Sequence, residues 1–415
     1  MKIEKVYFAP GFSSFYFDDQ AAIKAGSKQD GFIYVGETLT PGFNSIRQSG
    51  ECVSIMLELE NGLLAEGDCA AVQYSGAGGR DPLFTAERFI PLLKEHIEPL
   101  LIGRDIDTFR ENAAFFDTLE IDGKPLHTAI RYGLSQALLD ATAKANKLLK
   151  VEVVCREYDL PLQTSPLSLF AQSGDDRYGA VDKMILKRVD ALPHALINNI
   201  PTKLGENGGK LLEYVTWLTR RIEALRDGPT YSPKLHIDVY GTIGLIFKND
   251  PLKIADYLIQ LEERAKPFQL YIEGPADAGS KDGQIKLLAE IKKHLDDKAS
   301  NVRIVADEWC NTYQDVVDFV DQKCCHMVQI KTPDLGSIHN TIEAVLYCKK
   351  HTVEAYQGGT CNETDISART CVNVAQATRP ERVLIKPGMG FDEGMTVVAN
   401  EMNRNLSILA QKGEA

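Results

Sequence analysis

The chain has 415 residues, 44% of them hydrophobic and 25% charged, and is long enough for two globular domains. Its 46 basic and 58 acidic residues give a net charge of −12, which excludes a general attraction for nucleic acid or anionic membranes. Nine cysteines without Cys-x-x-Cys spacing indicate reduced thiols rather than a disulfide scaffold or zinc site. Neither a signal peptide nor a membrane-spanning run is recognisable, so we expect a cytoplasmic protein that binds small molecules and its own copies.

Residues 1–160 have the pattern of an α+β domain. Alternating apolar residues predict two strands around a tight Asn-Gly turn, and longer helical patterns follow. In chain order these elements are Val53–Leu59, the turn Glu60–Gly62, Leu63–Cys69, Ala86–Leu101 and His127–Lys147. We predict an N-terminal α+β capping domain.

Residues 161–415 alternate short apolar runs with helical stretches. Eight such runs suit a closed (β/α)8 barrel of the TIM type, so we assign the chain to the α/β class. The predicted strands are Leu167–Gln172, Ala195–Ile197, Lys234–Asp238, Phe268–Glu273, Arg303–Asp307, Met327–Lys331, Val353–Tyr356 and Arg382–Ile385.

Four consecutive predicted strands end in an ionisable residue. Three end in the carboxylates Asp238, Glu273 and Asp307, and the fourth ends in Lys331. The intervals of 35, 34 and 24 residues are close to what one strand, one helix and two loops require. Because all strands of a β/α repeat run the same way, we expect these side chains at one end of the barrel.

The two-residue period of a strand predicts which way these side chains point. In the strand ending at Glu273, the neighbours Leu270 and Ile272 belong to the outer face, so the carboxylate points into the barrel. The same parity places Gln329 and Lys331 together on the inner face.

Three acids that face one another repel unless a cation lies between them. A ligand set of oxygens only favours Mg²⁺ or Mn²⁺ over zinc. Asp238, Glu273 and Asp307 are therefore candidate metal ligands. Beside a dication, a partly buried Lys331 would be held as the neutral amine and could act as a base near neutral pH.

Each of these residues also has an ordinary interpretation. A single acid at a strand end more often caps a helix or turn, and a single lysine there is more often solvated. His194 lies just before a predicted strand, but an isolated histidine is more often structural than catalytic. The glycine-rich segment Gly76–Asp81 matches neither a dinucleotide fingerprint nor a phosphate loop, and we interpret it as a mobile loop that can close over the barrel mouth.

The capping domain, the three acids and the lysine together resemble the enolase superfamily. More narrowly, long segments along essentially the whole chain resemble the methylaspartate ammonia-lyase family. These segments are Phe15–Gln20, Gln73–Pro82, Phe170–Tyr178, His194–Asn199, His236–Gly244, Val305–Thr312, His326–Gly336 and Gly358–Thr364.

The resemblance implies an enolase-like fold and elimination of ammonia from (2S,3S)-3-methylaspartate to give mesaconate, a step of glutamate degradation. It implies that Lys331 removes the C3 proton, giving an enolate (aci-carboxylate) intermediate with Mg²⁺ assistance, while His194 lies on the opposite face. It further implies a monovalent cation such as K⁺ and a homodimer. The implied metal ligands are Asp238, Glu273 and Asp307, and the implied substrate-binding residues are Gln172, His194, Gln329, Thr360 and Cys361.

Two alternatives remain at this level. The first is a dehydratase, racemase or cycloisomerase on the same scaffold, because a metal triad with a lysine serves several reactions while the pocket selects the leaving group. The second is a non-catalytic barrel that binds a ligand. Tyr356 and Leu384, at or near predicted strand ends, are candidates for the wall around the substrate's alkyl group.

Overall fold

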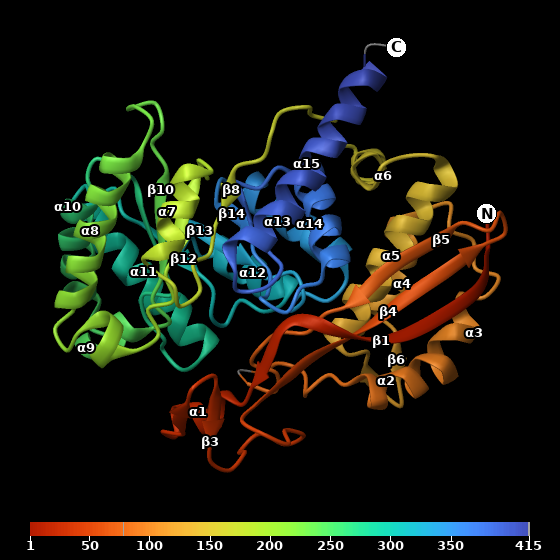
Figure 1. Ribbon diagram of the computed structural model, residues 1–415, viewed down its shortest axis with the longest axis horizontal. Helices are drawn as coiled ribbons and strands as arrows, with labels where there is room; N and C mark the ends of the chain where they lie inside the picture. The colour runs from red at the N-terminus through yellow and green to blue at the C-terminus, as the bar shows by residue number, and fades with distance from the viewer. Residues whose placement is uncertain (78, 414–415) are drawn as a thin grey trace.

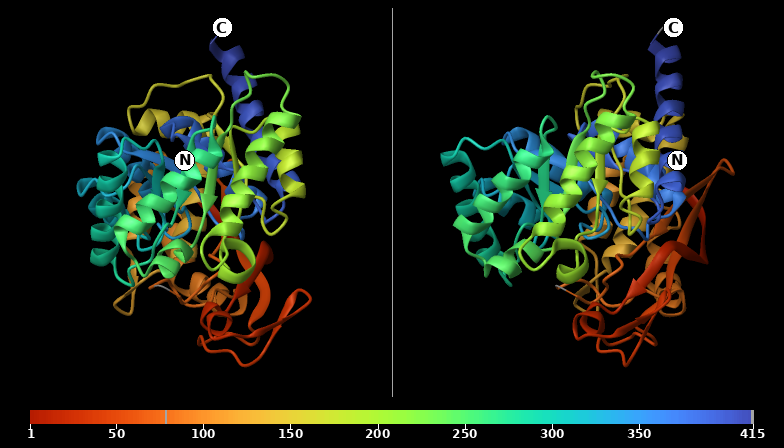
Figure 2. Two further views of the ribbon diagram at one scale, coloured as in Figure 1. Left: turned by 90° about the vertical axis from the view of Figure 1, so that its left-hand side faces the viewer. Right: turned by 60° about the vertical axis from the view of Figure 1, so that its left-hand side comes forward.

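The computed structural model describes residues 1–77 and 79–413 and has two packed parts (Figure 1). The N-terminal strands and helices, coloured red to yellow, lie against a barrel coloured green to blue. Both views in Figure 2 show the red strands at one end of the barrel. No helix within the described ranges combines the length and apolarity needed to cross a membrane.

The N-terminal part is built on a three-stranded antiparallel sheet in the order β1-β4-β5. Its strands are β1 (Ile3–Asp18), β4 (Arg47–Leu59) and β5 (Leu64–Cys69). The predicted hairpin is confirmed as β4 and β5, with Gly62 at φ 78° in the turn. The remaining small strands are β2 (Lys28–Asp30), β3 (Ile33–Val35), β6 (Glu120–Ile121) and β7 (Lys124–Pro125).

One long helix, α5 (Thr128–Asn146), covers this sheet. The two approach closely at a pair of glycines, since a Cβ on Gly67 would lie only 2.2 Å from the carbonyl oxygen of Gly133. The predicted helix at Ala86–Leu101 is also present, divided by one π-helical turn at Leu93–Ile97. The other helices of this part are α1 (Gln20–Lys24), α2 (Ala86–Leu92), α3 (Glu98–Leu101), α4 (Phe109–Asp117) and α6 (Lys150–Glu157).

The second part is a closed barrel of eight parallel strands, as predicted. Around the barrel the order is β10-β11-β12-β13-β14-β15-β8-β9. The strands are β8 (Leu169–Phe170), β9 (Ala191–His194), β10 (Lys234–Asp238), β11 (Leu270–Glu273), β12 (Arg303–Ala306), β13 (Met327–Ile330), β14 (Glu354–Gln357) and β15 (Arg382–Leu384).

Helices surround the barrel and separate its strands in the chain, which is the repeat that the sequence predicts. Their bounds are α7 (Gly179–Leu186), a π-helical turn (Ile200–Leu204), α8 (Gly209–Leu225), α9 (Thr242–Phe247), α10 (Pro251–Ala265), α11 (Lys281–Asp297), α12 (Tyr313–Asp321), α13 (Ile338–Lys350), α14 (Asp365–Thr378) and α15 (Phe391–Gly413).

The second strand of the barrel corrects one prediction. The sequence placed it at 195–197, but β9 spans Ala191–His194. The predicted segment does not continue the strand, because Ala195 and Leu196 have positive φ angles of 73° and 41°. His194 is therefore the last residue of a strand and not the residue before one. This places it at the carboxyl end of the barrel, together with the acids.

The predicted inward and outward alternation is confirmed. Tyr271 and Val305 belong to the cluster inside the barrel, whereas Ile272, Ile304 and Val328 pack towards the helices. The interior cluster consists of Phe170, Ala191, Tyr271, Val305, Met327, Tyr356 and Leu384. These side chains fill the interior of the barrel. The cavity therefore lies at the carboxyl ends of the strands.

The N-terminal part shares a hydrophobic core with one side of the barrel. Tyr132 of α5 is fully buried in the same cluster as Ile338 and Ile342 of α13 and Cys371 of α14. The two parts are therefore held together by buried contacts, and this positions the sheet end over the barrel mouth. Each of the nine cysteines, all within the described residues, is a buried free thiol.

Candidate active site

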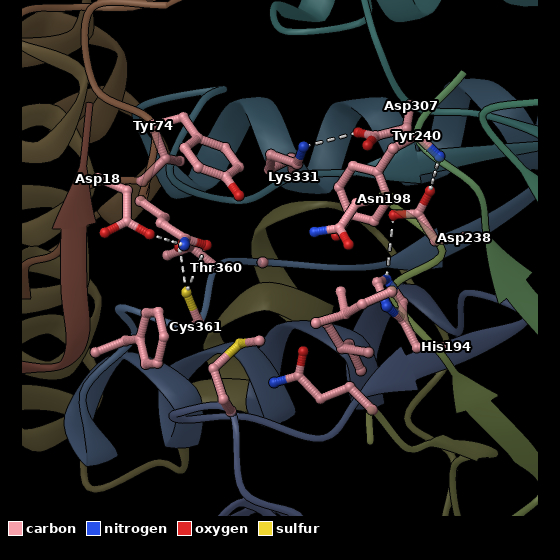
Figure 3. Close-up of a pocket in the computed structure, with 18 of the residues that line it drawn as sticks. Asp18, Tyr74, His194, Asn198, Asp238, Tyr240, Asp307, Lys331, Thr360 and Cys361 are labelled. Carbon is pink, nitrogen blue, oxygen red and sulfur yellow. Dashed lines mark hydrogen bonds and ion pairs between the residues drawn. The ribbon is translucent and has the colours of Figure 1, made fainter. Parts of the chain in front are cut away.

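The four ionisable residues that the sequence singles out meet at one end of the barrel. Asp238 and Glu273 are the last residues of β10 and β11 and stand opposite each other in register. Asp307 and Lys331 directly follow β12 and β13. Asp238, Asp307 and Lys331 line one side of a cavity of about 190 Å³, enough for a small molecule but not a polymer (Figure 3).

A compact group of potential ligands lies at the base of this cavity. One ligand atom from each of His194, Asp238 and Glu273 lies within 4.8 Å of the others. His194 Nε2 lies 3.6 Å from Asp238 Oδ2. The carboxylate of Asp307 is outside this group and turns towards Lys331 instead.

The electrostatics of the acids fit a divalent cation. Burial raises the pKa of Asp238 well above its usual value, and the charge of Asp307 raises it further. Burial likewise raises the pKa of Glu273, and Asp238 and Asp307 add to the effect. Carboxylates that repel in this way become ionised together only when positive charge lies between them. The donor atoms of the three acids are oxygens, which suits Mg²⁺ or Mn²⁺.

Glu273 is fixed from below by two buried side chains. The Tyr356 hydroxyl lies 2.8 Å from both carboxylate oxygens, and His236 Nε2 lies 2.7 Å from Oε2. Arg382 Nη1 lies 3.4 Å from the other ring nitrogen of His236. Because arginine can only donate, Nε2 of His236 carries the proton and donates it to Glu273. Tyr356 therefore supports an acid and does not line the cavity, which corrects the expectation that it walls the pocket.

Lys331 is buried and contacts Asp307. Its Nζ lies 2.8 Å from Asp307 Oδ1. Burial lowers the pKa of Lys331, but the charges of Asp307, Glu308 and Asp334 together outweigh burial, and the pKa lies above that of a free lysine. With the protein's own groups alone, Lys331 is an ammonium. The predicted neutral amine thus depends on a cation that competes for the Asp307 carboxylate.

His194 enters the cavity as a neutral ring. Burial lowers its pKa to about 4, against an opposing effect of Asp307. Among the described residues, none hydrogen-bonds to its buried Nδ1. A neutral imidazole with one free nitrogen can donate or accept a hydrogen bond with a ligand in the cavity.

The residues predicted to bind substrate all line this cavity. They are Gln172, His194, Gln329, Thr360 and Cys361. The Gln172 side-chain amide donates to the carbonyl oxygen of Gly388 at 2.5 Å, which orients it. Gln329 Oε1 is buried without a hydrogen-bond partner in the described part of the chain. Leu384 also lines the cavity, as predicted, and supplies an apolar surface.

Sequence reasoning missed the contribution of the N-terminal part. Asp18 and Tyr74 face the barrel residues across the cavity (Figure 3). Gln73 Nε2 donates to Asp18 at 2.7 Å, and the pair Arg47–Asp18 is held at 2.7 Å. The sequence feature that pointed to this contribution was the segment Gly76–Asp81. Its Arg80 Nε lies 2.9 Å from Asp334 Oδ2 of the barrel. Arg80 also lines the cavity at the barrel mouth, while Gly78 of the same segment lies outside the described residues.

The fold and the acidic strand ends together define an enolase-type barrel protein with a capping domain. The structure resembles muconate lactonizing enzyme from Pseudomonas putida with a TM-score of 0.60, over 91% of this chain and 85% of that one. Sequence identity is 15%, so this likeness concerns the fold alone.

Closer comparisons identify the family. Family models described as Methylaspartate ammonia-lyase N-terminus and C-terminus match residues 1–159 and 161–411. The methylaspartate ammonia-lyase of Citrobacter amalonaticus is 67% identical over 99% of this chain and 100% of its own length. The chain therefore belongs to the methylaspartate ammonia-lyase family.

Two solved structures of relatives support this assignment. The crystal structure of the Citrobacter amalonaticus enzyme containing (2S,3S)-3-methylaspartic acid has a TM-score of 0.98, covering 99% of this chain and 100% of that one. The Mg-complex of β-methylaspartase from Clostridium tetanomorphum has a TM-score of 0.95 at 53% identity, with coverage of 99% and 100%.

Proposed function

We propose that the protein is a carbon–nitrogen lyase that eliminates ammonia from (2S,3S)-3-methylaspartate to give mesaconate. The observation that carries the proposal is one lysine and a cluster of carboxylates in a single small cavity. A 67% identical relative was crystallised with (2S,3S)-3-methylaspartic acid, which supports this choice of substrate.

Asp238, Glu273 and Asp307 are the residues that would hold Mg²⁺, and Mn²⁺ is an acceptable substitute. The raised pKa values of Asp238 and Glu273 support a cation here, as does the Mg-complex of the Clostridium tetanomorphum relative. When bound, the ion supplies Lewis-acid stabilisation of the second negative charge on the substrate carboxylate.

Lys331 acts in this proposal as the base that takes the proton from C3. The electron pair left behind delocalises into the adjacent carboxylate and gives an enolate (aci-carboxylate). The pair then returns to form the C2–C3 double bond, while the C2–N bond breaks and its electrons leave with ammonia. Burial and the charge of Arg80 lower the pKa of Lys331, but Asp307 and the neighbouring acids raise it overall. The neutral amine that this step requires would therefore depend on a cation at the Asp307 carboxylate.

The neutral residues of the cavity orient the substrate. Gln172, Gln329, Thr360 and Cys361 offer hydrogen bonds to carboxylate oxygens without adding charge. His194 faces the substrate from the β9 side, where it stabilises the intermediate or serves the other stereoisomer at C3.

The remaining properties are proposals that the family membership supports. We infer that residues 1–160 form a capping domain and that residues 161–415 form the catalytic domain. We further infer a cytoplasmic homodimer that responds to a monovalent cation such as K⁺ and acts in glutamate degradation through mesaconate.

The direct test measures ammonia release from (2S,3S)-3-methylaspartate with and without Mg²⁺. We expect the ultraviolet absorbance of mesaconate to grow at the same rate as ammonia is released, and both to depend on Mg²⁺. Mg²⁺ with substrate should also raise the melting temperature, because ligands of the folded state stabilise it. An enzyme that forms no mesaconate but turns over a hydroxy acid would instead be a dehydratase. A protein stabilised by the ligand without turnover would be a binding module.

A further inference from the structure

A fully buried ion pair lies behind one wall of the cavity. Lys386 follows β15 by two residues, and Glu363 immediately precedes the cap of α14. Lys386 Nζ lies 3.0 Å from Glu363 Oε1, and both side chains are at most 1% exposed. Neither belongs to the described residues that line the cavity.

Every hydrogen-bonding position of the lysine is used. Lys386 Nζ donates to Glu363 Oε1 at 3.0 Å, to Thr332 Oγ1 at 3.1 Å and to the carbonyl oxygen of Gly358 at 2.6 Å. An ammonium has three donors, so this geometry leaves none over. Burial alone lowers the pKa of Lys386, but Cys371 and Glu363 outweigh it and raise the pKa, so the charge is retained.

The carboxylate is equally well satisfied. Glu363 Oε1 also accepts from Thr332 at 2.9 Å, and Oε2 accepts from Tyr132 at 2.9 Å and from Ser367. Tyr132 belongs to α5 of the N-terminal part. A buried polar network in which each member is satisfied is rigid, because any displacement leaves a group unpaired.

The partners of this pair adjoin the residues proposed to react with and bind the substrate. Thr332 is the next residue after Lys331. Gly358 precedes Gly359 and Thr360, which form the cavity wall. Gly359 packs directly on the pair, since a Cβ there would lie 2.3 Å from Lys386 Nζ.

The segment that carries Lys386 also makes backbone contacts with the rest of the predicted substrate site. Two residues further on, the Gly388 N–H donates to the carbonyl oxygen of Cys361 at 3.0 Å. The carbonyl oxygen of Gly388 accepts from Gln172 at 2.5 Å. The loops after β8, β13 and β14 thus all contact residues 386–388, a short stretch of the loop after β15.

We propose that Lys386 and Glu363 are positioning residues that hold Lys331 and the Gly358–Cys361 loop at a fixed separation across the substrate; this role rests on the function proposed above. A buried ion pair adds little net stability compared with a well-packed apolar pair, so stability alone does not account for it. The three N–H donors of Lys386 bind Thr332, Gly358 and Glu363 at once, which an apolar side chain cannot do. A misplacement of about 1 Å can lower an enzymatic rate by about 100-fold.

The kinetic test uses two variants that act on different loops. Lys386→Met releases both loops, so we expect kcat to fall by about 100-fold and KM to rise. Thr332→Val leaves the ion pair in place and releases only the Lys331 loop, so kcat should fall by about 10-fold with KM changed less than about twofold. The matched control is Lys412→Met, which removes a Lys–Glu pair between α15 and α6 that is partly exposed and far from the cavity.

The split between kcat and KM distinguishes positioning from simple stabilisation. If the pair only stabilised the fold, kcat per folded molecule would stay unchanged in both variants, and that result would overturn the proposal. Should Lys386→Met fail to fold, Thr332→Val decides by the same criterion. A loss of kcat in Lys412→Met equal to that in Lys386→Met would also overturn the proposal.

Amide hydrogen exchange tests the positioning role independently of the reaction. In Lys386→Met, residues 331–335 and 358–364 should exchange at least about 10-fold faster, with the rest of the barrel unchanged. Exchange that is unaltered in these segments, or accelerated throughout the chain, would contradict the proposal. If the wild-type protein released no ammonia from methylaspartate, the proposed function would fail, yet this measurement would still decide whether the pair fixes the two loops.

Discussion

Lys331 Nζ and Asp307 Oδ1 lie 2.8 Å apart, so the proposed base and a proposed metal ligand contact each other. The contact couples the two functions. Asp307 favours the protonated lysine, and any positive charge that Asp307 binds elsewhere weakens that preference. The charge state of the base is therefore set by what occupies the neighbouring carboxylate.

Replacing the base should separate catalysis from metal binding. In Lys331→Ala we expect turnover of (2S,3S)-3-methylaspartate to fall by at least about 1,000-fold, in the upper range for loss of a general base. Mg²⁺ affinity should stay equal or rise, because Asp307 loses a competing cation. Ammonia release and calorimetric titration with Mg²⁺ measure the two effects. Normal turnover in this variant would remove lysine from the mechanism.

Neutralising one acid should weaken the metal site. We predict that Asp307→Asn lowers Mg²⁺ affinity by at least about 10-fold, since a charged oxygen ligand is replaced by a weaker neutral one. Asp175→Asn is the matched control, because Asp175 lies at the cavity rim and is 81% exposed. Calorimetric titration measures both. An unchanged affinity in Asp307→Asn would exclude Asp307 as a ligand.

Several parts of this site were accessible from the sequence because their signal is local. A short apolar run that ends in an acid predicts both a strand and the direction of its last side chain, which is how Asp238 and Glu273 were found. His194 was assigned to the wrong side of a strand because Pro193 within β9 makes that strand look like a turn.

Other parts depend on contacts between distant segments and leave no local pattern. β1 contains Pro10 and Gly11 and reads as irregular, but pairing with β4 from Ile3–Leu59 to Asp18–Arg47 keeps it extended. The contact between Arg80 and Asp334 likewise joins residues 254 positions apart. Tertiary structure alone decides such features.

His194 should affect selectivity more than rate. Its ring is neutral and close to Asp238 but does not contact Lys331 in a hydrogen bond, so we expect His194→Ala to lower turnover of the (2S,3S) substrate by about 10- to 100-fold. Turnover of the (2S,3R) isomer should fall further if His194 is the base for that face. Rates with both isomers measure the change. Unchanged rates and unchanged selectivity would assign His194 a structural role.

The hydrogen bonds from Tyr356 to Glu273 should affect the affinity for Mg²⁺. Tyr356→Phe keeps the ring and removes only the hydroxyl that bonds both carboxylate oxygens. Loss of such an outer hydrogen bond lowers metal affinity by about 10- to 100-fold. Tyr347→Phe is the control, since its hydroxyl bonds Asp321 at the surface. Equal Mg²⁺ affinities in wild type and Tyr356→Phe would show that this hydroxyl does not tune the site.

Acid stability should depend on a histidine remote from the cavity. Burial lowers the pKa of His326 to about 4, and its Nδ1 accepts from the Ile304 N–H at 3.0 Å. The unfolded chain therefore binds this proton first as the pH falls, so the contribution to stability is present above pH 6.5 and is lost between about 6.5 and 4.

From pH 7 to pH 5 the loss at His326 amounts to about 2 kcal/mol. We predict that His326→Asn, whose side-chain oxygen can still accept from Ile304, loses less stability over this range than the wild type. Urea unfolding at both pH values gives the difference. If both proteins lose the same free energy of unfolding, His326 does not titrate on unfolding, and the acid sensitivity arises elsewhere in the chain.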